Sequence, residues 1–235
     1  MNGARWRYFY NRLIDLSGSA DDLLADMDPK TVAKIRMAET EDKMRCDWQM
    51  LTQGDQLEEI AMMWNQSIEA QRRWGMLNRS WLGEMISARV LEVAAVREMS
   101  GELLVYAVFF RDKQRVQQLM SVSPPRAALS AAGRAKTNRA SSFLVWRTLL
   151  RLKEQQVEYF DFGGWYPGGD DIQLLGANAF KKSFGGEVVQ EFECQQIITL
   201  KGWLGLNAAR LIARAKDAGS DKLRKKEENR DEAHI

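Results

Sequence analysis

The sequence predicts an α/β protein with a mixed, mostly antiparallel sheet and helices on both faces. Three strand candidates follow one another at 90–98, 103–111 and 116–123, and the short turns between them are typical of antiparallel hairpins. A helix candidate at 141–155 then leads to a short buried strand at 157–162. Strands and helices thus mix along the chain, which favours a layered α/β fold.

The elements before the three strands have clear local signals. Residues 5–16 are aromatic and extended in pattern, so we expect a strand. Ser19 and the pair Asp28-Pro29 are two helix N-cap signals, and they predict a short helix followed by a basic helix to about Ala38. Residues 43–51 place Met44, Cys46, Trp48 and Met50 on one face, as in a half-buried strand.

Further helices and strands are predicted on either side of these. Asp55 and Glu58 form a capping pattern for a long helix to about Arg73, and Ser80 begins another helix. A helix at 174–184 and a strand-rich run at 187–200 follow the 157–162 strand. Residues 202–216 form an amphipathic helix, which we expect to pack on the domain or a partner in preference to a membrane surface. The sequence from 218 onward is a charged tail.

Composition describes an ordinary globular protein. Apolar residues make up 45% and charged residues 28% of the 235, and the net charge of +2 gives no argument for nucleic acid. The two cysteines lack CxxC spacing, so reduced thiols are expected. The chain begins without the apolar run of a signal peptide and contains no stretch long enough to span a membrane. We therefore expect a cytoplasmic protein without stable membrane insertion.

Several common chemistries are excluded by missing residues. The one histidine, His234, lies in the terminal tail, so a Ser-His or Cys-His triad within the core is not expected. No G-x-S-x-G elbow, Walker A loop or H-E-x-x-H helix occurs. Zinc-type ligand spacing is also missing. The sequence predicts no metal site and no tightly bound cofactor.

The most informative segment runs from Tyr159 to Glu187. A strand ends in Asp161-Phe162-Gly163-Gly164, and Phe180-Lys181-Lys182-Ser183-Phe184-Gly185-Gly186 follows. This pattern resembles the Fem-type branch of the GNAT acyltransferase superfamily, which includes peptidoglycan-bridge aminoacyltransferases. A weaker match lies at 15–17 and 30–38.

The resemblance implies a single GNAT-like domain over about 40–200, with a 1–39 extension packed at the sheet edge, a helix at 201–217 and a tail at 218–235. It implies an N-acyltransferase of cell-envelope biosynthesis. The donor would be acyl-CoA or aminoacyl-tRNA, and the acceptor an amine of an envelope, polysaccharide or amino-acid precursor. The alternative is a catalytically inactive GNAT-fold module for binding or assembly. A homodimer and peripheral membrane contact through 202–216 are left open.

Acyl transfer from an activated donor needs alignment of the amine and stabilisation of an oxyanion, which backbone N–H groups and a cation supply. By resemblance, Lys181 contacts the donor phosphate or ester carbonyl; a helix cap or an ion pair with Asp161 is the alternative. Asp161 would orient the acceptor amine or take its proton; the alternative is a carboxylate that caps backbone. The expected donor-binding residues are Arg134, Lys136, Arg139, Gly163, Gly164 and Gly185.

Two departures from the family pattern bear on the substrates. The segment 131–138, which should hold a coenzyme A pyrophosphate before the 141–155 helix, contains one glycine where such loops carry several. This weakens acetyl-CoA as the donor. Bridge-forming relatives also contain two copies of the fold, and this chain has room for one, so a peptidoglycan precursor is a doubtful acceptor.

Overall fold

The computed structural model describes residues 5–52, 58, 79–124 and 129–195. The chain divides into two compact units. The larger unit is Phe9–Glu191, and the smaller unit combines Met1–Tyr8 with Phe192–Ile235. In the smaller unit the described residues are 5–8 and 192–195. The predicted helix after Asp55 (apart from residue 58), the amphipathic helix at 202–216 and the charged tail lie outside the described residues.

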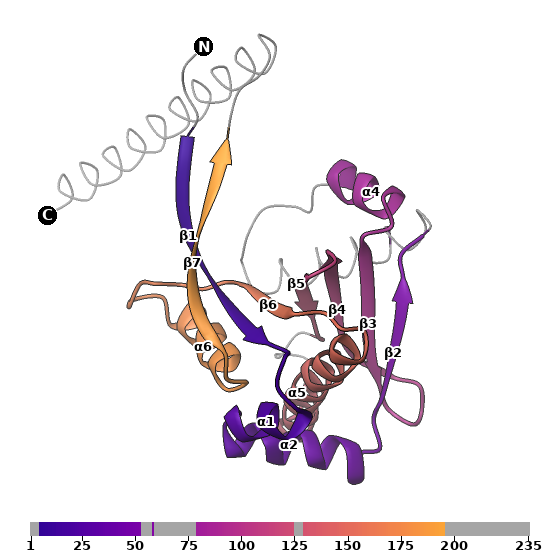
Figure 1. Cartoon of the computed structure of the whole chain (residues 1–235). Coiled ribbons are helices and arrows are strands. Elements are labelled where there is room, and N and C mark those ends of the chain that lie inside the picture. Colours follow the sequence, from indigo (N-terminus) through magenta and orange to yellow (C-terminus); the bar gives the residue numbers. More distant parts are fainter. Residues whose placement is uncertain (1–4, 53–57, 59–78, 125–128, 196–235) are drawn as a thin grey trace, which may run out of the picture. The chain divides into compact units, whose positions relative to one another are not determined.

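A single sheet runs through the larger unit (Figure 1). Its seven strands are β1 (Arg5–Asp15), β2 (Arg45–Met50), β3 (Leu91–Arg97), β4 (Leu103–Arg111), β5 (Arg115–Val122), β6 (Tyr159–Gly164) and β7 (Glu187–Gln195). They lie in the order β2-β3-β4-β5-β6-β1-β7. The pairs β2–β3, β3–β4, β4–β5 and β1–β6 are antiparallel, and β5–β6 is parallel. The predicted mixed, mostly antiparallel sheet is confirmed.

The N-terminal strand differs from the expectation of an edge extension. β1 lies between β6 and β7, inside the sheet. It pairs with β6 through Ile14 and Phe160, and Ile14 is 2% exposed. A strand with such a buried apolar side chain gains more from neighbours on both sides than an edge position offers.

The described helices begin where the sequence places their caps. They are α1 (Ala20–Asp26), α2 (Pro29–Thr40), α4 (Arg79–Ser87), α5 (Ala131–Glu154) and α6 (Ile172–Lys182). Ser19 forms a capping box with Asp22, and Asp28 caps α2 with Pro29 in the first turn. In the part of the chain that the structure describes, none of these helices combines the length and apolarity that crossing a membrane requires.

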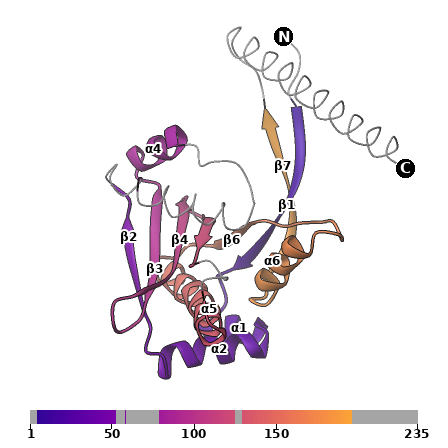
Figure 2. The same ribbon diagram turned by 180° about the vertical axis from the view of Figure 1, so that it is seen from behind.

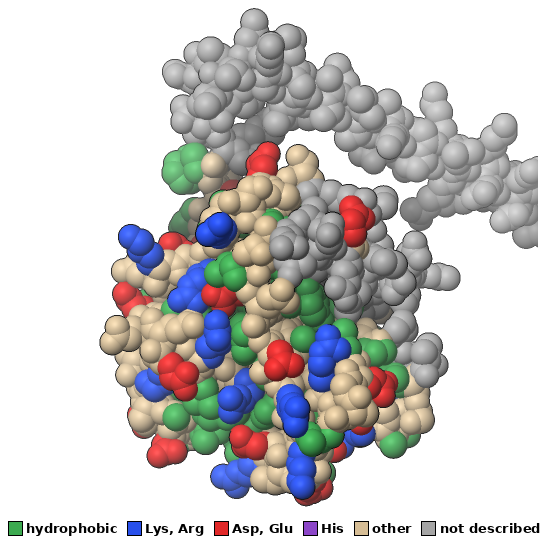
Figure 3. Space-filling view, turned by 90° about the vertical axis from the view of Figure 1, so that its right-hand side faces the viewer, with side chains coloured by type: hydrophobic (Ala, Val, Ile, Leu, Met, Phe, Trp, Pro, Cys, Tyr) green, Lys and Arg blue, Asp and Glu red, His purple; other side chains and the backbone are tan. Residues whose placement is uncertain are grey.

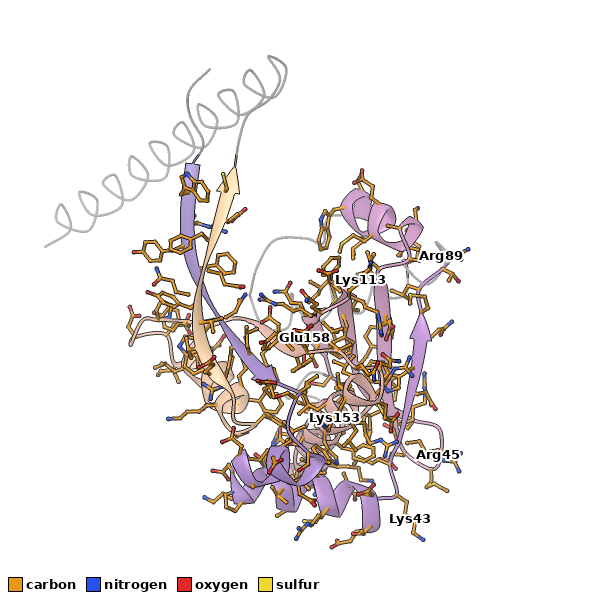
Figure 4. The ribbon with its side chains drawn as sticks, viewed as in Figure 1. Lys43, Arg45, Arg89, Lys113, Lys153 and Glu158 are labelled. Carbon is orange, nitrogen blue, oxygen red and sulfur yellow. The ribbon has the colours of Figure 1, made fainter. Side chains whose placement is uncertain are left out.

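The core consists of two apolar clusters on opposite faces of the sheet. Alternate residues along a strand belong to different clusters. Residues of α1, α2 and α5 belong to the larger cluster, and those of α4 to the smaller. Thus Ala107 and Phe109 of β4 belong to the larger cluster, while Val108 between them belongs to the smaller. Figures 1 and 2 show α1, α2 and α5 gathered together, away from α4. Lys153 of α5 (Figure 4) ties this layer to the chain after β1, since its Nζ donates to the Leu16 carbonyl at 3.1 Å.

Helix α5 begins earlier than the sequence analysis placed it. It starts at Ala131, not near Ser141. The Ser130 side chain caps it by accepting the Gly133 N–H at 3.1 Å, and the alanine-rich stretch that follows favours helix. The expectation that Arg134, Lys136 and Arg139 precede the helix is therefore wrong, because all three lie within its first turns.

Truncating Phe160 to alanine should lower the free energy of unfolding by about 3–5 kcal/mol. The ring is fully buried and lies between Phe109 and Phe162, with centroids at 6.3 and 4.8 Å. Urea unfolding followed by circular dichroism measures the change. Ile172→Ala is the control, since that side chain is 84% exposed and its loss should change stability by less than about 0.5 kcal/mol. Equal effects of the two changes would contradict this description of the core.

Candidate functional site

The parallel pairing of β5 and β6 stops early. Three residue pairs, from Arg115–Tyr159 to Gln117–Asp161, are in register, although β5 continues to Val122 and β6 to Gly164. Both strands are irregular at this level: the register of β5 against β4 shifts next to Gln118, and that of β6 against β1 shifts after Asp161. Bulges redirect backbone groups away from the ladder. The carboxyl ends of the two parallel strands thus present backbone at the edge where open sheets usually bind ligands.

Gly163 allows the irregularity in β6. Its φ is +71°, which favours glycine, and a Cβ at this position would lie 3.2 Å from the Gln118 carbonyl oxygen of β5. The Gly163 N–H donates to Oδ1 of Asp161 at 2.7 Å. Of the glycine pair predicted from sequence, Gly163 is therefore favoured by both its conformation and the close approach of β5, whereas a Cβ at Gly164 would meet nothing within 4 Å.

Asp161 is the centre of a polar network that crosses four adjacent strands. Its side chain is fully buried, and Oδ2 accepts from Nε of Arg115 on β5 at 3.0 Å. Nη2 of Arg115 also donates to Oε2 of Glu191 on β7 at 2.8 Å. Nδ2 of Asn11 on β1 donates to both carboxylates, at 3.4 Å to Oδ2 of Asp161. The side chains of Arg115 on β5 and Asn11 on β1 thereby connect two carboxylates, which belong to β6 and β7.

Burial and pairing act in opposite directions on these charges. Burial raises the pKa of Asp161, while hydrogen bonds from Arg115 and the Gly163 N–H oppose that rise. The pKa of Glu191 is lowered by its hydrogen bond from Arg115, and that of Arg115 is raised chiefly by Glu191. Asn11 is 1% exposed, and its Oδ1 is buried without a hydrogen-bond partner.

Lys181 lies beside the end of β6. From the last turn of α6, its Nζ donates to the Gly163 carbonyl at 3.3 Å and to the Gly164 carbonyl. Burial lowers the pKa of Lys181, and the negative charge of Asp161 opposes this effect. Sequence spacing left open whether the end of α6 could return to β6. The structure brings Lys181, Asp161 and the glycine pair together.

The return of α6 depends on Asn178. This buried amide donates to the Tyr166 carbonyl at 2.7 Å and accepts the Tyr166 N–H at 3.1 Å. The loop after β6 is thereby held against the middle of α6. The Trp165 N–H also donates to the Tyr10 carbonyl of β1 at 2.6 Å. Together these bonds fix the direction in which the helix leaves the strand.

Gly185 lies apart from this group, in the turn from α6 to β7. Its φ is +80°, and a Cβ there would collide with the Asp26 carboxylate of α1. Its carbonyl accepts from Nε of Arg12 at 2.8 Å. These contacts give Gly185 a structural reason to be glycine; its predicted contact with a donor stays a prediction.

The three basic residues of α5 have partners elsewhere. Lys136 donates to Glu98 at 2.8 Å, and Arg139 donates to Asp42 at 2.6 and 2.9 Å. Arg134 is exposed and donates to the Leu129 carbonyl at 2.6 Å. None of these hydrogen bonds among described residues connects the three to β6 or α6. Their predicted role at an anion-binding mouth stays a prediction.

Sequence reasoning missed Arg115, Asn11 and Glu191. The available signal was a polar side chain within a predicted strand, as with Asn11 in β1. That signal indicates a need for partners but does not identify them. In the described part of the chain, no group of three or more His, Cys, Asp or Glu side chains is placed to hold a metal ion.

Replacing Arg115 with methionine should lower the free energy of unfolding by about 3–5 kcal/mol, because the buried Asp161 carboxylate loses its cation. Chemical denaturation at neutral pH measures the loss. Arg7→Met is the matched control: the Arg7 side chain is 79% exposed, so breaking its pair with Glu193 should cost less than about 1 kcal/mol. Adding Asp161→Asn to Arg115→Met should recover part of the stability. A double variant no more stable than Arg115→Met would contradict the assignment.

Glu191→Gln should destabilise the protein at neutral pH and lose this effect in acid. Because Arg115 lowers the folded-state pKa of Glu191, its contribution is present above the unfolded pKa of about 4.3 and is lost as pH falls through the folded value. Unfolding curves of the two proteins from neutral to acid pH measure the difference. A difference that stays constant or grows below about pH 4 would contradict this assignment.

Known structures share this fold. No protein-family model matches the sequence, and no curated protein matches it. A crystal structure titled FemX aligns over 76% of this chain, at 13% identity and a TM-score of 0.57. This chain spans 59% of the FemX chain.

Two further structures align over a larger share of the chain. The C-terminal domain of a putative lysylphosphatidylglycerol synthetase from Agrobacterium fabrum aligns over 89% of this chain and 67% of its own, at 16% identity and a TM-score of 0.51. L-PGS from Bacillus licheniformis aligns over 90% and 68%, at 13% identity and a TM-score of 0.50. At such identities the likeness concerns the fold alone, which this chain shares with FemX and the two lysylphosphatidylglycerol synthetase structures.

Proposed function

We propose that this protein is an N-acyltransferase that moves an acyl or aminoacyl group from an activated donor to an amine. The observation that carries the proposal is the early end of the β5–β6 pair, with the Gly163-Gly164 backbone and the Lys181 ammonium beside it. The exposed Gly164 and the cation beside it lie in a GNAT/Fem-type fold. Acyl transfer from an activated ester or thioester needs little more than such a site.

In the proposed reaction, the acceptor amine attacks the carbonyl carbon of the donor. A C–N bond forms, and the bond to the thiolate or ribose oxygen of the donor breaks. The amine gives up one proton, and the leaving group takes one. Since the Gly163 N–H donates to Asp161, the Lys181 ammonium would stabilise the oxyanion of the tetrahedral intermediate.

Lys181 is assigned to the donor. An ammonium has three N–H donors, and the carbonyls of Gly163 and Gly164 accept two of them, which leaves one for a phosphate or ester oxygen. Burial lowers the Lys181 pKa, so the ammonium also gives up a proton more readily than a surface lysine. The contact with the β6 carbonyls sets the position of the charge.

Asp161 is assigned to positioning. This role corresponds to the backbone-capping carboxylate that the sequence analysis gave as the alternative to a role at the acceptor amine. Its carboxylate is fully buried, Oδ1 accepts the Gly163 N–H, and Oδ2 accepts from Arg115. It thus holds the glycine pair in the conformation that Lys181 contacts. Direct proton transfer from the acceptor to Asp161 would require these contacts to open.

Donor phosphates are assigned to the first turns of α5. The N-terminal end of a helix favours anions, and Arg134 is exposed there. Lys136 and Arg139 would join the site by exchanging Glu98 and Asp42 for phosphate oxygens. Both acyl-CoA and aminoacyl-tRNA carry phosphates, so this assignment suits either donor.

A cell-envelope acceptor and a cytoplasmic location complete the proposal. One structural neighbour supports a cell-envelope acceptor, because a lysylphosphatidylglycerol synthetase is by its name a protein that makes an aminoacylated lipid. That name also favours an aminoacyl over an acetyl donor for this chain. The single glycine in 131–138 points the same way.

A catalytically inactive GNAT-fold module is the second candidate. The burial of Asp161 and of Met120, which is 6% exposed and belongs to the smaller core cluster, favours it. An acceptor site that includes both side chains is closed in this structure. The two candidates differ in whether the protein turns over an activated donor.

Lys181→Ala should reduce the rate of transfer by more than about tenfold, which corresponds to about 1.4 kcal/mol of transition-state stabilisation. The assay incubates the protein with panels of acyl-CoA and charged tRNA and a mixed set of amines, and detects products by mass spectrometry. Lys182→Ala is the matched control, because Lys182 is the exposed neighbour on the same helix end. It should keep the wild-type rate.

Two outcomes would contradict this assignment. Equal rates for the Lys181 and Lys182 variants would remove Lys181 from the mechanism. No product from any donor, with a folded protein and with donor binding intact, would favour the inactive module.

A further inference from the structure

One amide oxygen of β1 is enclosed in the sheet without a donor. On the face of the molecule in Figure 3, basic and acidic side chains are interspersed over the described surface, so that surface presents no patch of a single sign. Asn11, by contrast, is 1% exposed, and among the described residues no donor reaches its Oδ1. Gln118 and Arg151 also carry such an atom, but both side chains are partly exposed. A buried acceptor without a donor costs free energy, which a ligand with an N–H would recover.

The orientation of the Asn11 amide is fixed by two carboxylates. Its Nδ2 donates to Oδ2 of Asp161 at 3.4 Å and to Oε2 of Glu191. An ionised carboxylate only accepts hydrogen bonds, so turning the amide over would place Oδ1 against these oxygens. Oδ1 is therefore the atom of this amide that is left for a ligand.

Asn11 lies beside the proposed donor site. It is in register with Gly164 across the antiparallel β1–β6 pair, and the Gly164 carbonyl accepts from Nζ of Lys181. Residues in register across such a pair have Cα atoms about 4.5–5.5 Å apart. The amide oxygen without a donor and the ammonium assigned to the donor carbonyl therefore adjoin the same residue of β6.

The charges around Asn11 favour a cation. Asp161 and Glu191 share the guanidinium of Arg115, while Lys181 donates to carbonyls of β6. A phosphate at this place would meet like charge, whereas an ammonium offers N–H donors together with a positive charge. The side chains of Arg115 and Glu191 are 29% and 28% exposed, so this part of the network reaches the surface.

We propose that Asn11 binds the acceptor of the transfer as a primary ammonium, whose N–H donates to Oδ1 beside the carboxylate of Glu191. The inference rests on the proposed function, and it names the acceptor class as a primary amine that arrives as a cation. Because Asn11 is enclosed, entry requires the partly exposed Glu191 side chain to move aside. The ammonium gives one proton to water before the attack, and the neutral amine keeps its hydrogen bond to Oδ1.

Amine titrations of the full chain, followed by NMR, test this site. Isotope-labelled protein is titrated at neutral pH with ethylammonium, and the side-chain amide signals of Asn11 are followed. Tetramethylammonium, which has the same charge but no N–H, and ethanol, which has a donor but no charge, are the matched controls. The Asn11 signals should shift saturably with ethylammonium, and the dissociation constant for each control should be at least about tenfold larger. Unmoved Asn11 signals, or equal constants for ethylammonium and either control, would overturn the proposal.

Glu191→Gln tests the contribution of the carboxylate. The change keeps the shape of the side chain but removes its charge, so the dissociation constant for ethylammonium should rise by about tenfold. Glu193→Gln is the matched control, since Glu193 lies on the same strand and pairs with the exposed Arg7. In the transfer assay, Glu191→Gln should raise KM for the amine by about tenfold and leave KM for the donor unchanged, which a loss of folded protein would not do. Equal ethylammonium constants for the two variants would overturn the proposal.

The amine site and the proposed function can fail separately. Transfer that depends on Lys181, without any shift of the Asn11 signals by ethylammonium, would overturn the amine site and leave the proposed function standing. Selective binding of ethylammonium at Asn11, with no transfer from any donor, would support the amine site and favour the inactive module over the proposed function.

Discussion

The burial of one carboxylate between four strands is the constraint on which the rest of the site depends. Asp161 has no exposure to water, so its charge requires partners within the sheet. Arg115 supplies the cation from β5, and Asn11 supplies an amide from β1. Arg115 then reaches Glu191 on β7, which draws the last strand into the same network. Leaving one of these charges without a partner would thus disturb hydrogen bonds on four of the seven strands.

The same carboxylate sets the backbone that the proposed chemistry would use. By accepting the Gly163 N–H, Asp161 stabilises the irregular end of β6, where the pairing with β5 ends. The carbonyls of that end in turn hold Lys181. The stability of the sheet and the geometry of the proposed site therefore share one set of hydrogen bonds, which is why Asp161 is assigned to positioning.

The division of the chain into two units separates two kinds of surface. The larger unit holds the buried polar network and the basic first turns of α5, where the proposed transfer would occur. The smaller unit holds exposed aromatics and the excess of positive charge.

Local chemistry determined most of the secondary structure, and tertiary structure decided the site. Ser19, Asp28 with Pro29, and the alternation in β2 act through near neighbours, so the sequence predicted those elements. The short turns that join β3, β4 and β5 predicted the antiparallel part of the sheet. The predicted start of α5 near Ser141 was wrong, because the cap at Ser130 and the alanines after it already favour helix. The Asp161–Gly163 contact is local, but Arg115, Asn11 and Glu191 lie 30 to 150 positions from Asp161, and only the strand order brings them to it. A charge that is buried in a sheet indicates in the sequence that it needs a partner, while the fold alone determines which residue that partner is.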